Sequence, residues 1–220
     1  MAVEVRGLGS GAIVVPTDVS VPADCRRLAE ATVEAFGRLD LLVNNAGISM
    51  LAPFGEVEDP ETLARVMDVN YMGAVRCTHA ALPQLAASGG RLVAVASLTA
   101  LAGVPGRSGY AASKHAMAGF FDSLRIELAS RGVSVTVAYP GFVDTGIRER
   151  AVGTGRGRGE GIAAGKMMAA DECARRILEA AADRRREVRM TWRGALAPWL
   201  RLLAPRLVDR MAARAVGWPP

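Results

Sequence analysis

Residues 108–141, SGYAASKHAMAGFFDSLRIELASRGVSVTVAYPG, contain the pattern that decides the fold. From Tyr110 to Arg131 the apolar residues have the spacing of a long amphipathic helix, which should end near Gly132. The β-branched run Val133 to Ala138 follows at once and is stopped by Pro140, as in a buried parallel strand. A helix that leads directly into an apolar strand is typical of an α/β fold.

The same alternation of elements extends toward the N-terminus. We expect buried strands over Ala12–Pro16, Leu39–Val43 and Arg91–Ala96, and helices over Ala23–Phe36 and Glu61–Ala87, the latter interrupted only at Pro83. Alternating strands and helices with short connections predict parallel strands joined by right-handed crossovers. The predicted fold class is therefore α/β, a doubly wound parallel sheet, with functional residues just after the strands.

Length and composition restrict the class of protein. The chain has 220 residues, half of them apolar and few aromatic, which fits one domain with one core. Cys25, Cys77 and Cys173 share no spacing typical of a disulfide framework or a zinc site, so no metal is expected. No segment reaches the roughly 18 consecutive apolar residues of a spanning helix, and Glu4 and Arg6 oppose a secretory signal. A cytoplasmic protein is expected.

The net charge of +5 comes largely from the C-terminal third, and such a diffuse, aromatic-poor basic segment does not predict nucleic acid as a partner. Residues 191–220 combine apolar and arginine side chains in an amphipathic tail, which could be an interfacial membrane helix. Pro198 and Pro205 interrupt the tail. Shorter helices that cover a pocket or pack in a homo-oligomer interface are therefore favoured over a membrane surface.

Residues with chemical potential follow the expected strands. Tyr110 and Lys114 are four residues apart and so share one helix face, where an ammonium group would lower the pKa of the phenol. A phenol can exchange the proton that accompanies hydride transfer to a carbonyl. Ser97, at a strand end, could donate a hydrogen bond to the substrate oxygen, and the Asn70 amide could hold a water molecule. These residues predict an oxidoreductase that interconverts an alcohol and a ketone.

Several of these residues also have a purely structural interpretation. Asp18 could serve only as a turn or helix-capping residue, and Asn44-Asn45 could be only a loop. Four apolar residues near the strand ends either line an apolar substrate pocket or continue the core, namely Met50, Leu98, Val104 and Phe142.

The motifs in combination resemble the short-chain dehydrogenase/reductase family. They are NNAG at 44–47, Asn70 in VNYMG, Ser97 thirteen residues before Tyr110, YAASK at 110–114 and YPGFVDT at 139–145. The resemblance covers the chain from about Ala12 to Thr145. It implies a Rossmann-like domain, NAD or NADP as cofactor, and a small-molecule alcohol or carbonyl as substrate.

The resemblance also implies roles for individual residues. It assigns catalysis to Asn70, Ser97, Tyr110 and Lys114. It assigns cofactor contacts to Asp18, Asn44, Ala46, Gly47, Tyr110, Lys114, Pro140, Gly141, Val143 and Thr145. The substrate would lie over Ser97 and Tyr110, with Leu98, Val104 and Phe142 as further contacts.

One family motif is missing from the sequence. The family opens with a strand and T-G-x-x-x-G-x-G, where backbone N–H groups bind the cofactor pyrophosphate. Residues 7–12, GLGSGA, match a looser pattern but precede the first expected strand, so we expect a loop there. The chain is therefore expected to lack the family's first βαβ unit, which would leave unpaired backbone and an exposed apolar face.

Two hypotheses follow from this gap. In the first, the natural protein begins further upstream and is an NAD(P)-dependent oxidoreductase, with residues 146–165 as a mobile substrate loop. In the second, the chain is a degenerate, non-catalytic remnant that acts as a binding or oligomerisation partner. The sequence does not choose between NAD and NADP, because the residues that select between them belong to the missing unit.

Overall fold

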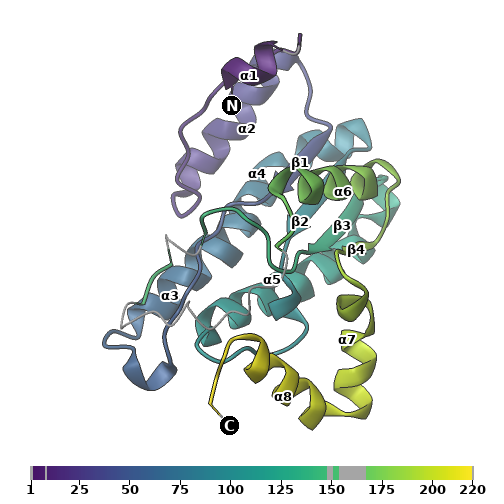
Figure 1. Ribbon diagram of the computed structural model, residues 1–220. Coiled ribbons are helices and arrows are strands. Elements are labelled where there is room, and N and C mark those ends of the chain that lie inside the picture. The colour runs from purple at the N-terminus through teal and green to yellow at the C-terminus, as the bar shows by residue number, and fades with distance from the viewer. Residues whose placement is uncertain (1, 8, 148–150, 154–166, 220) are drawn as a thin grey trace.

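The computed structural model describes residues 2–7, 9–147, 151–153 and 167–219, and contains a parallel sheet (Figure 1). Its four strands lie in the order β1 (Leu41–Asn44), β2 (Arg91–Val95), β3 (Ser134–Tyr139) and β4 (Glu187–Arg189). Asn44 is level with Ala94, and Val95 with Ala138, so the carboxyl ends of the strands meet at one edge. The predicted α/β fold with a parallel sheet is confirmed.

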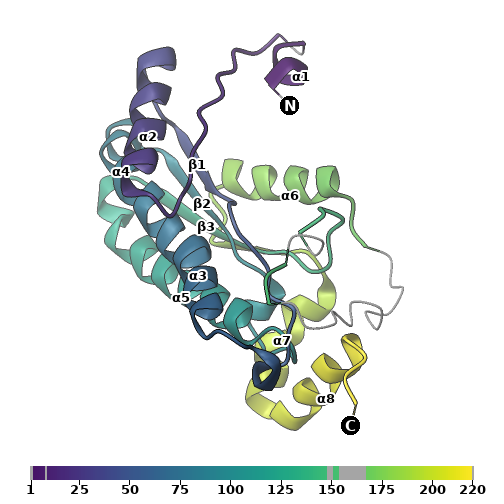
Figure 2. The ribbon, with the colours of Figure 1, turned by 90° about the vertical axis from the view of Figure 1, so that its left-hand side faces the viewer.

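Helices cover both faces of the sheet (Figure 2). On one face lie α4 (Gly73–Ser88) and α5 (Ser108–Glu127), and on the other α6 (Ala170–Ala182). Successive residues of a strand point to opposite faces, so Leu92 packs in the core beneath α4 and α5, whereas Val93 packs with α6. β2 and β3 are therefore buried on both sides.

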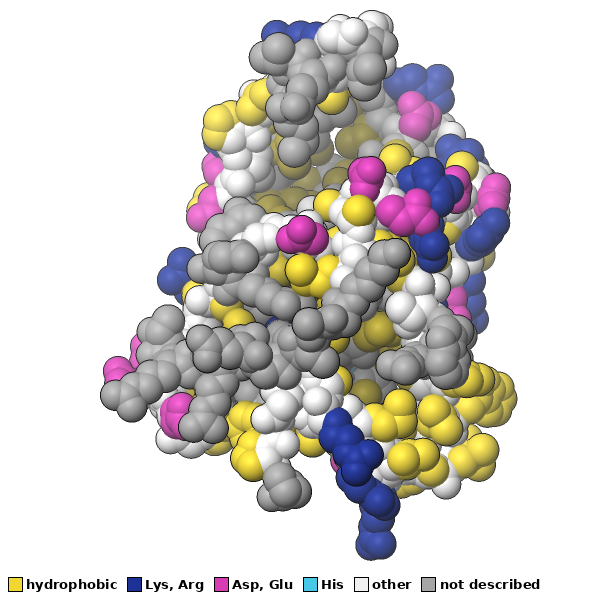
Figure 3. Space-filling view, viewed as in Figure 1, with side chains coloured by type: hydrophobic (Ala, Val, Ile, Leu, Met, Phe, Trp, Pro, Cys, Tyr) yellow, Lys and Arg dark blue, Asp and Glu magenta, His cyan; other side chains and the backbone are white. Residues whose placement is uncertain are grey.

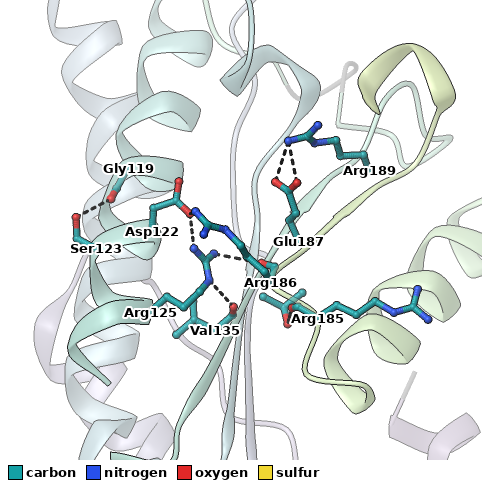
Figure 4. Close-up of polar contacts among 10 residues, drawn as sticks. Gly119, Asp122, Ser123, Arg125, Val135, Arg185, Arg186, Glu187 and Arg189 are labelled. Carbon is teal, nitrogen blue, oxygen red and sulfur yellow. Dashed lines mark hydrogen bonds and ion pairs between the residues drawn. The ribbon is translucent and has the colours of Figure 1, made fainter. Parts of the chain in front are cut away.

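Arg125 of α5 ties this helix to the last two strands (Figure 4). Its guanidinium donates to the carbonyl oxygens of Val135, at 3.0 Å, and Arg186, at 3.2 Å, and forms an ion pair with Asp122. One side chain thereby fixes α5 against β3 and against the residue that precedes β4.

The predicted strand over Ala12–Pro16 is wrong. These residues have no regular secondary structure, and Val14 is 70% exposed. A strand needs a hydrogen-bonded neighbour, and a groove of about 260 Å³ separates this segment from β1. The expected exposed apolar face is found there, because Leu41 and Val43 of β1 are exposed on the α6 side of the sheet, where α6 packs on β2, β3 and β4. Of the loop predicted over residues 7–12, Gly7 instead ends the first helix, Leu8 lies outside the described residues, and residues 9–12 form a loop.

The N-terminal helices lie beside this groove. α1 (Ala2–Gly7) precedes the irregular segment and α2 (Pro22–Phe36) follows it, ending at Gly37 in the left-handed conformation as predicted. α2 packs on α4, where the Cys25 and Cys77 sulfur atoms are 3.6 Å apart as free thiols.

The helix expected over Glu61–Ala87 is divided, but not at Pro83. It consists of α3 (Glu61–Met67), a π-helical segment η2 (Asp68–Met72) and α4, which continues through Pro83. The π-helical turn inserts extra backbone where Asn70 lies, and such turns are frequent at functional sites.

Two helices end the chain. α7 (Trp192–Leu203) contains Pro198, whereas Pro205 begins α8 (Pro205–Ala215), so the predicted interruption holds only at Pro205. Within the described residues no helix is both long and apolar enough to cross a bilayer. Short 3-10 turns complete the fold: η1 (Phe54–Glu56), η3 (Leu98–Ala100) and η4 (Ala129–Arg131).

Candidate active site

Tyr110, Lys114 and Ser97 lie together at the carboxyl edge of the sheet. Tyr110 and Lys114 are one turn apart near the start of α5, and the Lys114 Nζ atom is 5.8 Å from the centre of the Tyr110 ring. Ser97 follows β2, and its hydroxyl lies close enough to the Tyr110 phenol to lower the pKa of that phenol. The predicted acid, cation and serine are therefore brought together from two elements.

Lys114 is held rigidly beneath this group. Its Nζ atom donates to the carbonyl oxygen of Val95 at 2.8 Å, and the residue is 3% exposed. Burial disfavours the ammonium form and lowers the pKa of Lys114 to about 8. Lys114 can therefore lose its proton in the weakly basic range instead of near the ordinary lysine value of about 10.4.

The pKa of Tyr110 does not move in the direction that the sequence suggested. Burial raises it above the ordinary phenol value, and this outweighs the opposite effects of the Ser97 hydroxyl and the Arg107 charge. The expectation that Lys114 would lower the Tyr110 pKa omitted the desolvation of the phenolate. Tyr110 is therefore a neutral phenol at pH 7, ready to donate a proton.

Asn70 has a different environment from the one expected. Its Oδ1 atom accepts from the backbone N–H of Ile48 at 2.8 Å, while Nδ2 donates to the Ile48 carbonyl at 3.0 Å and to Ser113 Oγ at 2.9 Å. The fully buried amide is thus engaged with protein atoms, and the prediction that it holds a water molecule is not supported. Asn70 instead fixes the loop after β1 to α5.

Ser113 is a residue that the sequence reasoning missed. It accepts from Asn70 and donates from its own Oγ to the Tyr110 carbonyl at 2.8 Å, so it connects the π-helical segment to the turn that carries Tyr110. Its place inside YAASK, between Tyr110 and Lys114, was the available signal.

Gly47 lies directly against this network. A Cβ atom there would be 3.0 Å from Asn70 Oδ1 and 3.7 Å from Lys114 Nζ. The first separation is tighter than ordinary packing, so glycine lets the loop approach both side chains. Gly47 is therefore a predicted cofactor residue from the NNAG motif that lies close to both Lys114 and Asn70.

The other predicted cofactor residues of the N-terminal half lie elsewhere. The Asn44 amide is buried and donates to Thr78 Oγ1 at 3.0 Å, and both Asn44 and Ala46 line the groove beside β1. Asp18 is exposed and accepts from the backbone N–H and hydroxyl of Ser20, which lowers the pKa of its carboxyl group. The structure therefore gives Asp18 a turn role before α2.

The turn after β3 approaches the residues that follow β2. The carbonyl oxygen of Pro140 accepts from the backbone N–H of Leu98 at 2.9 Å. Val143 forms an isolated parallel bridge with Met168, and Thr145 is exposed. The predicted cofactor turn thus lies beside Ser97, apart from Asn44 and Ala46 in the groove.

Of the apolar candidates, Leu98 makes the most informative contacts. A Cβ atom at Gly141 would lie 3.4 Å from Leu98, and one at Gly194 of α7 only 2.6 Å, so Leu98 is inserted between the β3 turn and α7. Val104 is half-buried and Phe142 is 42% exposed. Met50 is fully buried in a cluster with Tyr110, so it belongs to the core.

No group of side chains with metal-binding potential occurs in the described parts of the chain. Most of the expected mobile loop, residues 146–165, lies outside the described residues.

Comparison with known proteins agrees with this arrangement. The family model for short chain dehydrogenase matches residues 1–156, which is more than two thirds of the chain. The chain belongs to the short-chain dehydrogenase family. The resemblance stated from the motifs is therefore confirmed.

Named members of the short-chain dehydrogenase family are similar over nearly the whole chain. The chain is 36% identical over 214 residues to 11-beta-hydroxysteroid dehydrogenase 1A of Arabidopsis thaliana, covering 93% of this chain and 61% of that protein. It is 36% identical over 211 residues to dehydrogenase/reductase SDR family member 7B of Rattus norvegicus, covering 92% and 63%. The chain therefore spans about three fifths of the length of these relatives.

Solved structures of short-chain dehydrogenases share the fold. One from Burkholderia phymatum in complex with NAD superposes with a TM-score of 0.83 at 28% identity, covering 94% of this chain and 81% of that chain. One from Burkholderia cenocepacia in complex with NADP gives a TM-score of 0.75 at 26% identity, covering 91% and 77%.

The site residues of this short-chain dehydrogenase fit one end of a dinucleotide. Lys114, an amine beside a donor phenol, suits contact with a ribose next to a nicotinamide, and Gly47 lets the loop after β1 lie close to that amine. At the other end, no glycine-rich turn among the described residues leads directly from a strand into a helix, the usual pyrophosphate site.

Proposed function

We propose that this chain is an NAD(P)-dependent oxidoreductase that interconverts a secondary alcohol and a ketone, with Tyr110 as the acid and base. The observation that carries the proposal is the buried Tyr110 phenol, which lies beside the Ser97 hydroxyl and whose ring centre is 5.8 Å from Lys114 Nζ. The NAD and NADP complexes of similar structures support the choice of cofactor. The dehydrogenase names of the relatives support the reaction class.

The chain's own residues account for the proton transfer. In the direction of reduction, the neutral Tyr110 phenol donates its proton to the carbonyl oxygen, and Ser97 donates a hydrogen bond to the same oxygen. A nicotinamide cofactor, when bound, supplies the hydride to the carbonyl carbon or accepts it back. The nearby Lys114 ammonium then stabilises the tyrosinate that remains.

Two groups of residues are suited to the cofactor. Lys114 and Gly47 would contact the nicotinamide ribose, and the turn from Pro140 to Thr145 would lie beside the nicotinamide ring. Asn44 and Ala46, which line the groove beside β1, would lie near the adenosine half. Asp18 is exposed and accepts from Ser20 through Oδ1 alone, so its other carboxylate oxygen could still reach the adenosine half.

We further propose an apolar substrate. Leu98 directly follows Ser97, Phe142 is exposed in the turn after β3, and Val104 is half-buried. The Arabidopsis relative carries a hydroxysteroid name. A bulky apolar alcohol would bury its ring system against these side chains. A homo-oligomeric state and a cytoplasmic location stay predictions from the sequence.

Tyr110→Phe tests the proposal. It keeps the ring and removes the acidic proton, so turnover should fall by about 10² to 10⁴-fold while cofactor affinity is unchanged. Tyr71→Phe is the matched control, because the Tyr71 ring packs edge-on against Phe120 and no hydrogen bond of its hydroxyl occurs among the described residues. NADPH- or NADH-dependent reduction of a panel of apolar ketones measures turnover, and calorimetric titration measures binding.

Undiminished turnover in Tyr110→Phe would refute the assignment. If neither NADH nor NADPH binds in the micromolar range and the chain co-purifies with a longer relative, the non-catalytic alternative replaces the proposal for this chain.

A further inference from the structure

Helices α7 and α8 expose a large apolar surface. Trp199, Leu202 and Leu203 of α7 are 65%, 74% and 78% exposed, and Leu207 and Met211 of α8 are also exposed. Figure 3 shows hydrophobic side chains gathered at the lower right, where Figure 1 places α7. Scattered single apolar residues are normal on a protein surface, but a contiguous patch with an exposed tryptophan marks an interaction site.

The same two helices carry most of the excess positive charge. Five arginines and one acidic residue, Asp209, occur between positions 192 and 219, so four of the five net positive charges of the chain are in this segment. Arg201 donates to the Leu101 carbonyl and contacts His115, which ties α7 to the body. Arg206, Arg210 and Arg214 are exposed along α8, and no ion pair within the described residues involves them.

Apolar and cationic residues are arranged as an amphipathic surface. In α7, Leu196, Trp199 and Leu203 recur at spacings of three and four residues and share one side of the helix. In α8, Arg206, Arg210 and Arg214 recur every four residues. Arginine stems can lie along apolar surface while the guanidinium groups reach phosphate oxygens.

We propose that the α7–α8 hairpin docks onto the surface of an anionic phospholipid bilayer. The apolar side chains of α7 would enter the boundary between headgroups and acyl chains, and the arginines of α8 would contact lipid phosphates. At 1.5 Å per residue the twelve residues of α7 extend about 18 Å, shorter than the roughly 30 Å hydrocarbon layer, so the helix lies along the surface. The docking itself does not rest on the proposed function, whereas the route by which a substrate would reach the site does.

A second copy of the chain, which the sequence favoured over a membrane for this segment, fits the surface less well. In a twofold contact the same patch lies on both subunits, so the arginines of α8 would face or adjoin their own equivalents. Like charges brought together at an interface are unfavourable, and charged residues are depleted from interface cores. Anionic lipid, in contrast, complements both the charge and the apolar area.

The α7–α8 hairpin lies next to the candidate active site, so docking would bring that site close to the bilayer. Gly194 of α7 packs on Leu98, directly after Ser97, and Trp218 lies 3.7 Å from the Cβ position of Gly106, in the loop before α5. A docked hairpin therefore places the candidate active site next to the bilayer. An apolar alcohol dissolved in the bilayer would reach Ser97 from the side of α7.

Co-sedimentation with vesicles tests the proposal. The probes are vesicles of phosphatidylcholine alone and of phosphatidylcholine with about one third phosphatidylserine. Each arginine near an anionic surface contributes roughly a fivefold change in partition, so Arg206→Gln/Arg210→Gln/Arg214→Gln should weaken binding to the anionic vesicles by about 100-fold. Trp199→Gln/Leu202→Gln should weaken binding by at least tenfold, and 0.5 M NaCl should weaken it in the parent chain.

Matched controls use exposed residues outside the hairpin. Ile126→Gln removes an exposed apolar side chain from α5, and Arg131→Gln removes an exposed arginine from η4. Both should leave binding unchanged, and circular dichroism melting should show all variants folded.

Two outcomes would overturn the proposal. The first is parent protein that stays in the supernatant with anionic vesicles, or hairpin variants that bind as well as the controls. The second is a parent chain that is dimeric by light scattering and becomes monomeric in Trp199→Gln/Leu202→Gln without any vesicle binding, which would make a second copy the occupant.

Discussion

Replacing Asn70 by aspartate should remove the donor group that holds the loop after β1 against α5. The Asn70 amide donates to the Ile48 carbonyl at 3.0 Å and to Ser113 Oγ at 2.9 Å, and accepts from the Ile48 N–H at 2.8 Å. An ionised carboxylate keeps the accepted bond but turns an oxygen toward the Ile48 carbonyl. The Ser113 hydroxyl can reorient, whereas the Ile48 carbonyl loses its donor.

The expected cost follows from the burial of these groups. A buried polar group that loses its partner costs about 1–3 kcal/mol, and burial of the new charge adds to this, so Asn70→Asp should lower the free energy of unfolding by about 2–4 kcal/mol. With a urea dependence of about 3 kcal/mol per molar, the unfolding midpoint falls by roughly 1 M. Asn45→Asp is the control, because Asn45 is exposed directly after β1. It should change the free energy of unfolding by less than about 0.5 kcal/mol.

The pH dependence sharpens this experiment. Burial raises the pKa of the new carboxyl in the folded state above its unfolded value of about 3.9, so the folded variant binds the proton more tightly. The loss in free energy of unfolding caused by Asn70→Asp should therefore become smaller as the pH falls from 7 to 4.5. In that range a protonated carboxyl can donate to the Ile48 carbonyl. A loss no larger than that of Asn45→Asp, or one that is independent of pH, would refute the assigned network.

Two further changes test the burial of Lys114 and the packing around α4. Because the pKa of Lys114 is lowered to about 8 in the folded protein, its unfolded form binds more protons between about pH 8 and 10.4. The free energy of unfolding should therefore rise by up to about 3 kcal/mol across that range, relative to Lys114→Met. Urea titration at pH 7 and pH 10 measures this difference. The same pH dependence in both proteins would contradict the lowered pKa of Lys114. Gly73→Ala should cost about 1–3 kcal/mol, because its Cβ would lie 2.6 Å from a neighbouring side chain, whereas Gly119→Ala, with open space in the middle of α5, should be neutral or stabilising. Equal melting temperatures for these two alanine variants would show that the close contact at Gly73 is absent.

The elements that the sequence predicted well are those with strong local signals. The periodicity before Gly37 and Gly132, and the β-branched run before Pro140, identified α2, α5 and β3 with small errors at their ends. The run at Ala12–Pro16 carried an equally strong local signal and is not a strand. A strand is defined by its neighbours, so a local pattern could not reveal that this segment has no pairing partner among the described residues.

The residues of the candidate site were predictable from their spacing, but their electrostatics were not. The i, i+4 relation placed Tyr110 and Lys114 on one helix face. Burial then set the direction of both pKa shifts, and burial depends on the whole fold. The π-helical turn at Asn70, and hence the contact of its amide with Ile48, also had no signal in the periodicity of the segment Glu61–Ala87.

The edge of β1 that faces the groove also determines which part of the protein should unfold locally first. In a parallel strand, alternate residues bond to opposite neighbours, so part of the β1 backbone points away from β2 toward the groove. Amide protons there exchange with solvent through small local fluctuations, while those between β2 and β3, buried on both faces, require nearly global unfolding. The β1 edge of the sheet should therefore open locally well before β2 and β3 do. α5, which carries Tyr110, packs on the part of the sheet that opens last.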